Sequence, residues 1–273
     1  MVKDKLFPWV SVVVLSVILL GCMFAEVLMT TDPTFLNLQC CDLPPCREFL
    51  FGTDPLGRDI FSGIWYGGRI SVTIGFLAAA ISTFIAILYG TLCGLAPGWL
   101  DRGMMRFLEV FLSIPYLLLV LCLQGILGKG NVLSLSFVIG ITLWPAIARV
   151  VRTEVRQLRS GECILAAKAM GCGWGHILRW YLVPNFLSSI CFMVVMNVGS
   201  AIAMESTLSF LGMGLPLEVI SWGSMLSLAQ KALLTGSWWI ILIPGAFLIG
   251  LLRCLTSIGN ALRRAADRRE RKI

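Results

Sequence analysis

Six long apolar segments dominate the pattern of the sequence. Each comes close to the roughly 20 residues that a helix needs to cross about 30 Å of hydrocarbon. Backbone polar groups cannot remain unpaired in lipid, so we predict that these segments are helices of an all-α, polytopic membrane protein. They run approximately over Phe7–Met29, Ile70–Leu95, Phe107–Leu127, Val132–Val151, Phe186–Phe210 and Trp238–Ile258.

The composition supports a membrane protein. Of the 273 residues, 58% are hydrophobic and 14% are charged, whereas soluble domains are about 45–50% apolar and about 25% charged. We expect an uncleaved N-terminal transmembrane helix in residues 1–30, because the apolar run continues past Cys22, which a cleaved signal would not do. An external loop follows in 31–69, then a membrane core in 70–258 with a cytoplasmic loop in 152–185, and a basic tail in 259–273.

Lysine and arginine indicate the orientation. If the N-terminus is cytoplasmic, six spans leave only five of the 22 basic residues outside, namely Arg47, Arg58, Arg69, Lys129 and Lys231. This asymmetry follows the positive-inside rule and places both termini in the cytoplasm. The net charge of +7 therefore reflects topology, and we expect the lipid bilayer, rather than nucleic acid, as the surrounding partner.

A polar segment, RSGECILAAKAMGCGWGHILRWYLVPN, interrupts the apolar pattern at residues 159–185. It begins like a helix and reaches Gly171, a residue suited to ending one. Four of its residues are spaced to share one helix face, which is small or apolar. A polar, ordered-looking segment in an otherwise apolar protein indicates a contact with another molecule. The four residues of this face are Cys163, Ala166, Ala167 and Met170.

Two external features have open interpretations. In FGTDPLGRDIFSGIWYGGRIS, residues 51–71, the charged residues are expected to pair among themselves as a structural cap, or to contact substrate as an external gate. Those four are Asp54, Arg58, Asp59 and Arg69. The second feature is a group of three cysteines, Cys40, Cys41 and Cys46. We expect either a disulfide or metal clip, or no role at all. Three cysteines do not define a disulfide pairing. We predict no metal site.

Several motifs together resemble one family. They are GTDPLGRDIFS at 52–62, YGGRISV at 66–72, the 159–185 segment, LSFLGMG at 208–214 and SWGSML at 221–226. In this order they are similar to the C-type inner-membrane permease subunits of dipeptide, oligopeptide and nickel ABC importers. The resemblance implies a type I ABC importer permease fold in the cytoplasmic membrane of a bacterium. It also implies three kinds of partner: a second homologous permease, two cytoplasmic ATPase subunits and an external substrate-binding protein.

The resemblance assigns the polar segment to a coupling helix that docks on an ATPase. Glu162, Ala166, Ala167, Gly171 and Pro184 match the family pattern, and Cys163 and Met170 share the expected contact face. The chain contains no G-x-x-x-x-G-K-[ST] phosphate loop. We therefore expect a non-catalytic subunit without a cofactor of its own, with ATP and Mg bound by the partners, and transport by alternating access.

Polar residues inside the predicted spans are candidates for the translocation path, because such residues are costly in lipid. They are Gln124, Asn197 and Glu205, and Glu205 is alternatively an anchor for the outer loop. Glu109 is expected to pair with Arg106 or to face solvent. Pro115, Pro145 and Pro244 are candidate hinges or ordinary packing positions, and Trp222, Trp238 and Trp239 suit the interface belt of a membrane.

The sequence leaves the substrate open. Peptides are the first expectation, and nickel or a metal chelate is the alternative, although the single histidine, His176, gives little support to a bare-metal relay. Two more distant classes are a membrane redox protein that uses the external cysteines and a stand-alone channel or secondary transporter. The tail GNALRRAADRRERKI departs from the usual family ending at Asn260, Arg264 and Ala266, so we expect only a basic segment near anionic lipid.

Overall fold

The computed structural model describes residues 8–128, 130–159, 173, 183–216, 218–228, 232 and 236–270, with side chains outside 183–189 and 266–270. This part of the chain is helical, and its only extended pairing is an isolated bridge between Thr53 and Asp59. The α-helices are α1 Trp9–Met23, α2 Ala25–Leu28, α3 Ile60–Leu95, α4 Gly98–Ser113, α5 Tyr116–Leu127, α6 Val132–Arg159, α9 Val183–Phe210, α10 Trp222–Ser227 and α12 Trp239–Glu270.

Four helices, α3, α6, α9 and α12, are long and apolar enough to cross a membrane, and the bent pair α4–α5 allows a fifth span. They correspond to four of the six predicted segments. The N-terminal segment is shorter than predicted, because α1 has only 15 residues and ends at Met23. Glu26, which interrupts the apolar run, lies in the separate helix α2 and pairs with Arg69 of α3 at 2.8 Å.

The segment 107–127, predicted as the third span, is bent. The chain forms α4 and α5, which meet at 86°. Ile114 between them is extended, with ψ of 129°, and Pro115 follows it. Proline disfavours the helical conformation of the residue before it, so this proline breaks the helix. Pro145 and Pro244 instead lie within the continuous helices α6 and α12.

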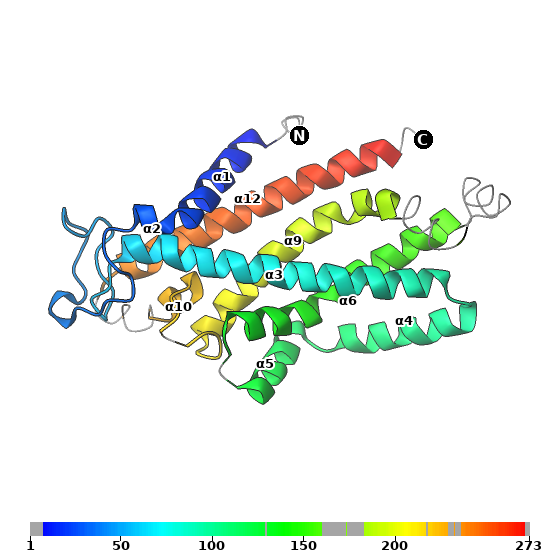
Figure 1. The fold of residues 1–273 in the computed structure, drawn as a ribbon, viewed down its shortest axis with the longest axis horizontal. Helices are drawn as coiled ribbons and strands as arrows, with labels where there is room; N and C mark the ends of the chain where they lie inside the picture. Colours follow the sequence, from blue (N-terminus) through cyan, green and yellow to red (C-terminus); the bar gives the residue numbers. More distant parts are fainter. Residues whose placement is uncertain are drawn as a thin grey trace.

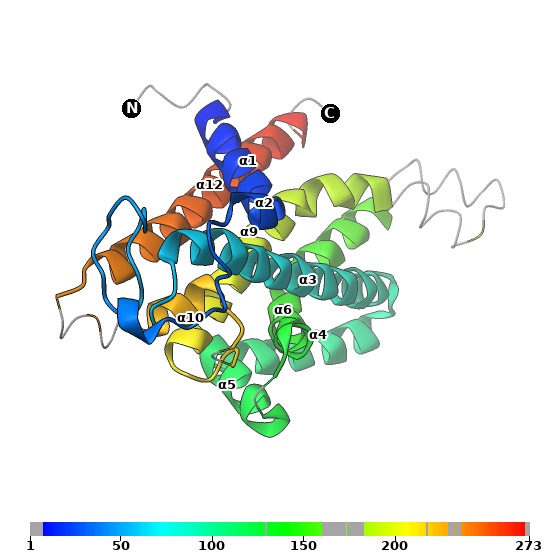
Figure 2. The same cartoon turned by 60° about the vertical axis from the view of Figure 1, so that its left-hand side comes forward.

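The long helix α3 forms the centre of the bundle, with α6, α9, α12 and α1 around it (Figures 1 and 2). It begins before the predicted Ile70, because Asp59 caps its first turn. Small residues let α3 and α6 approach closely, as is common between membrane helices. A Cβ on Gly90 would lie 2.6 Å from the Ala148 carbonyl oxygen, and one on Gly94 would lie 2.6 Å from Val155 Cγ1.

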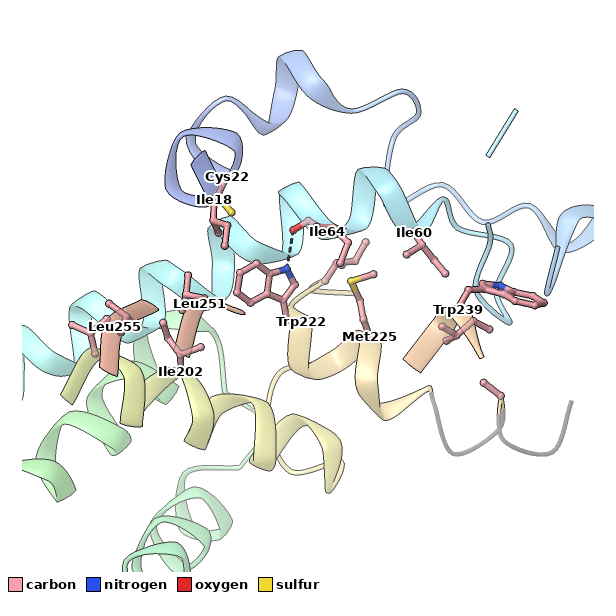
Figure 3. Packing of buried hydrophobic residues seen from close by; sticks show 14 of the residues in the cluster. Ile18, Cys22, Ile60, Ile64, Ile202, Trp222, Met225, Trp239, Leu251 and Leu255 are labelled. Atoms are coloured by element: carbon pink, nitrogen blue, oxygen red, sulfur yellow. Dashed lines mark hydrogen bonds between the residues drawn. The ribbon is translucent and has the colours of Figure 1, made fainter. Parts of the chain in front are cut away.

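A buried apolar cluster joins α1, α3, α9, α10 and α12 (Figure 3). Trp222 of α10 is completely buried in it and donates from Nε1 to the Ile64 carbonyl oxygen at 2.8 Å. Trp239 is 9% exposed and donates to the Thr53 carbonyl oxygen at 3.2 Å, whereas Trp238 is 55% exposed. The interface-belt prediction is therefore wrong for Trp222 and Trp239, because their N–H groups find carbonyl partners inside the fold.

The two ends of the bundle differ. The loop 29–59 and α10 lie at one end, whereas the end of α6, the start of α9 and the connection from α3 to α4 lie at the other (Figure 1). The helix α12 also points towards that second end and continues to Glu270, so the predicted tail from 259 extends the last helix. The loop 29–59 and the ends of α6 and α9 that face each other in the sequence therefore lie at opposite ends of the bundle.

Candidate functional site

Glu205 of α9 lies in a cluster of serine hydroxyls. Its side chain is completely buried. It accepts hydrogen bonds from serines of α3, of α9 and of the cap of α10. Ser221 Oγ donates to Oε1 at 2.7 Å, and Ser209 Oγ donates to the same atom at 3.0 Å. Ser71 Oγ of α3 donates to Oε2 at 3.0 Å, and Ser206 adds a longer contact at 3.4 Å. We call these five residues the Glu205 cluster.

The Glu205 cluster joins α3, α9 and α10. Ser221 caps α10 through a reciprocal pair of bonds with Ser224, and the Trp222 backbone N–H donates to Ser71 Oγ at 3.2 Å. The neighbouring hollow, of about 170 Å³, is lined by Ser209, Ser224 and Ser227 among others, without Glu205. Glu205 is therefore enclosed, and it holds the segment after α9 against α3.

The other two path candidates lie in different surroundings. Asn197 of α9 donates from Nδ2 to Ser82 Oγ of α3 at 3.0 Å. Gln124 of α5 is 3% exposed and donates from Nε2 to the Gly128 carbonyl oxygen at 3.1 Å, while its Oε1 is buried without a hydrogen-bond partner. Asn197 and Glu205 thus both contact α3, whereas Gln124 bonds within its own segment.

The serine partners were missed by the sequence reasoning. Ser71 and Ser82 are eleven residues apart, so they share one face of a helix. Asn197 and Glu205 are eight residues apart and lie on one side of α9. The two spacings differ by three residues, so the sequence alone does not pair Ser71 with Glu205 or Ser82 with Asn197. A single serine in an apolar helix carries too weak a signal to be chosen alone.

The charged residues of segment 51–71 form turns and a helix cap. Asp59 accepts from the Phe61 and Ser62 backbone N–H groups at 3.2 and 3.1 Å, and from Thr30 Oγ1 at 2.8 Å. Asp54 Oδ1 accepts from the backbone N–H groups of Leu56 and Arg58 at 2.9 and 2.8 Å. Burial raises the pKa of Asp54 above its ordinary value. These contacts hold the turn that leads into α3.

The expectation that the four charged residues of segment 51–71 pair among themselves is wrong for Arg69, which pairs with Glu26 instead. Asp54, Arg58 and Asp59 line a cavity of only about 20 Å³, which is room for about one water molecule. That volume is far too small for a peptide. The exposed pair between Arg106 and Glu109, at 3.0 Å, confirms the expectation for Glu109.

The three cysteines of the loop 29–59 are free thiols, with Cys40 and Cys41 half-buried and Cys46 exposed. Among the described residues, no three histidine, cysteine, aspartate or glutamate side chains gather closely enough to hold a metal ion. The loop therefore offers no assembled ligand set in this part of the chain.

Most of the predicted coupling residues lie outside the described residues. These are Glu162, Cys163, Ala166, Ala167, Met170 and Gly171. Pro184 lies in the first turn of α9, where a helix has no internal partner for the missing N–H group. The ends of α6 and α9 that flank the segment lie at the end of the bundle opposite the loop 29–59 (Figure 1).

Comparisons with known proteins agree on the family. Residues 86–272 match the family described as "Binding-protein-dependent transport system inner membrane component". The oligopeptide transport system permease protein OppC of Bacillus subtilis is 36% identical over 99% of this chain and 88% of its own length. The dipeptide transport system permease protein DppC of the same organism is 37% identical over 85% of this chain and 72% of its own length.

A more distant relative and a solved structure extend this agreement. The probable D,D-dipeptide transport system permease protein DdpC of Escherichia coli is 32% identical over 95% of this chain and 85% of its own. A chain of the inward-facing MetNI methionine ABC transporter shares the fold, with a TM-score of 0.59, 19% identity, and coverage of 75% of this chain and 96% of that one. The chain therefore belongs to the inner-membrane permease components of binding-protein-dependent transport systems, and it has the type I ABC importer permease fold.

Proposed function

We propose that this chain is the translocating subunit of an ATP-driven importer that carries dipeptides or oligopeptides across the cytoplasmic membrane of a bacterium. The observation that carries the proposal is the match over nearly the whole chain to permeases whose names concern peptide transport. Peptides are preferred over nickel because all three of these names concern peptides. The external cavity at Asp54 is too small for a peptide, so we do not assign substrate contact to it.

Energy enters through partner subunits in this proposal. The chain has no phosphate loop of the G-x-x-x-x-G-K-[ST] type, so ATP and Mg are assigned to two cytoplasmic ATPases. One of these docks on the 159–185 segment, with Glu162, Ala166, Ala167 and Gly171 at the contact. An external binding protein delivers the substrate, and both termini are cytoplasmic, as the basic residues indicate.

Alternating access requires a pathway between this chain and a second permease. Asn197 and Gln124 remain our candidates for polar contacts along that pathway. Glu205 is assigned instead to holding α10 in place, because it is enclosed by serines. The break between α4 and α5 adds a hollow of about 260 Å³, lined by Phe111–Tyr116, Leu119 and Thr142.

Variants of the 159–185 segment test the proposal. Gly171→Pro and Glu162→Lys are expected to leave membrane insertion intact and to abolish peptide-stimulated ATP hydrolysis in the assembled complex. Glu48→Lys is the matched control, because it makes the same charge reversal on an exposed residue of the external loop. Hydrolysis and peptide uptake are measured in proteoliposomes. Normal uptake by both segment variants would contradict the docking role of the segment.

A further inference from the structure

A buried carboxylate links the start of α4 to the end of α6. The Asp101 side chain is 5% exposed. Arg152 holds it with two parallel hydrogen bonds of 2.6 Å, from Nε to Oδ1 and from Nη2 to Oδ2. Arg156, one helical turn further along α6, donates from Nη1 to Oδ2 at 3.0 Å. We call Asp101, Arg152 and Arg156 the Asp101 cluster.

The positions of these charges suit the helix ends on which they lie. Asp101 is in the first turn of α4, where the helix dipole favours a negative charge, and Arg156 is in the last turn of α6, where it favours a positive charge. Arg159, in the last turn of α6, donates to the Leu95 carbonyl oxygen at the end of α3 at 3.1 Å. Three helix ends are thus connected by polar contacts at one place.

The helices α3 and α6 form the rigid side of this junction. A Cβ on Gly94 of α3 would lie 2.6 Å from Val155 Cγ1 and 3.2 Å from the Arg152 carbonyl oxygen. Backbones this close leave little room for either helix to slide past the other. The helix α4 is attached to this pair by the Asp101 cluster, by Tyr89 Oη donating to the Met104 carbonyl oxygen at 2.7 Å, and by the buried Leu108.

The Asp101 cluster lies between two segments that matter for transport. Residues 160–182, which follow α6 directly in the sequence, carry the proposed ATPase contact. The helix α4 leads into the 86° break and α5, where the hollow of about 260 Å³ lies. The buried ion cluster is therefore one link through which a displacement of α6 can reach the bent pair.

We propose that the Asp101 cluster positions α4 on α6 and transmits movement of the coupling segment to the α4–α5 bend. A bidentate arginine–carboxylate pair fixes both distance and orientation. Separating a buried pair leaves an uncompensated charge, so the link resists being pulled apart. This inference rests on the proposed function, and it assigns a coupling role to three residues that bind neither peptide nor ATP.

The test uses the complete importer complex in proteoliposomes, with hydrolysis measured with and without peptide-loaded binding protein. Asp101→Asn keeps the side-chain shape and removes the charge. It is expected to leave basal hydrolysis near the wild-type rate and to lower peptide uptake per ATP hydrolysed by about tenfold. The exchange of charges in Asp101→Arg with Arg152→Asp restores a carboxylate between two guanidinium groups, and is expected to recover most of the uptake.

Arg106→Gln is the matched control, because it breaks an exposed ion pair with Glu109 on the same helix, and it is expected to behave as wild type. Unchanged uptake per ATP in the assembled Asp101→Asn complex would overturn the inference. If that variant fails to assemble, Arg156→Gln is used instead, because it leaves the bidentate pair between Asp101 and Arg152 intact. Reduced peptide uptake per ATP in Arg156→Gln supports the inference, and wild-type uptake per ATP overturns it. A wild-type complex without peptide-stimulated hydrolysis would instead contradict the proposed function.

Discussion

At the scale of single residues, Glu205 shows how a carboxyl group is accommodated inside an apolar bundle. Three serine hydroxyls donate to it at 2.7 to 3.0 Å, and these serines come from α3, from α9 and from the cap of α10. A buried polar group without partners is costly, so removing the carboxylate leaves several hydroxyls without their acceptor. The same bonds that satisfy Glu205 also fix the position of α10.

The variant Glu205→Ala is therefore predicted to destabilise the fold by about 3 kcal/mol, from lost hydrogen bonds and an unfilled space. Ser206→Ala is the control, because the Ser206 hydroxyl makes only a 3.4 Å contact with Glu205. Thermal unfolding of the purified chain in detergent measures both. Equal melting temperatures for Glu205→Ala and wild type would show that the cluster contributes nothing to stability.

At the scale of helices, close approach between α3 and α6 depends on glycine. Gly90 faces the Ala148 carbonyl oxygen and Val151 on α6, and an added Cβ would lie 2.6 Å from that oxygen. Backbone atoms cannot move aside as the end of a flexible side chain can. The pair α3–α6 is thus sensitive to a single methyl group at this position.

We predict that Gly90→Ala lowers the free energy of unfolding by roughly 1–3 kcal/mol, because overpacking forces the backbones apart. Gly103→Ala on α4 meets no atom within 4 Å and is expected to be neutral or to stabilise by about 0.5–1 kcal/mol, since alanine favours a helix. Thermal unfolding of the two variants compares them directly. A stabilising Gly90→Ala would contradict the tight α3–α6 contact.

The helices also show what the sequence can predict. Apolar length identified α3, α6, α9 and α12, because continuous hydrophobicity reports membrane burial directly. It did not show that Pro115 breaks the third segment, since Pro145 and Pro244 are tolerated inside their helices. It also placed Trp222 at a membrane interface, because tryptophan composition does not reveal the carbonyl of Ile64 that receives its N–H group.

Part of the candidate site could be predicted from the sequence, and part could not. Glu205 and Asn197 were found because polar residues stand out in apolar spans. Their serine partners depend on which helix faces meet, and that is a property of the packed bundle. Asp59 was expected to pair with another charged residue, but it caps α3 by accepting from backbone N–H groups. The charges in the sequence do not by themselves predict this cap.

At the scale of the whole molecule, the bundle has two chemically different ends. Loop 29–59 lies at one end, and the ends of α6 and α9 that flank the polar segment lie at the other (Figure 1). The basic residues near α6 and α12 favour the cytoplasm for the second end. The proposed orientation follows from this division and can be tested without the partner proteins.

A chain that retains only Cys46 is predicted to react with a membrane-impermeant maleimide in intact cells, because Cys46 is exposed in the external loop. A chain that retains only Cys172, within the polar segment, is expected to react only after the membrane is permeabilised. Labelling is read by mass shift after reduction. The reverse pattern would invert the proposed topology.

The most direct test of the account is purification of the tagged chain in mild detergent, followed by measurement of ATP hydrolysis with and without peptide-loaded binding protein. We predict that two ATPase subunits and a second permease purify with the chain, and that peptide raises the hydrolysis rate. A chain that purifies alone or only with copies of itself, without hydrolysis that responds to peptide, would contradict the account.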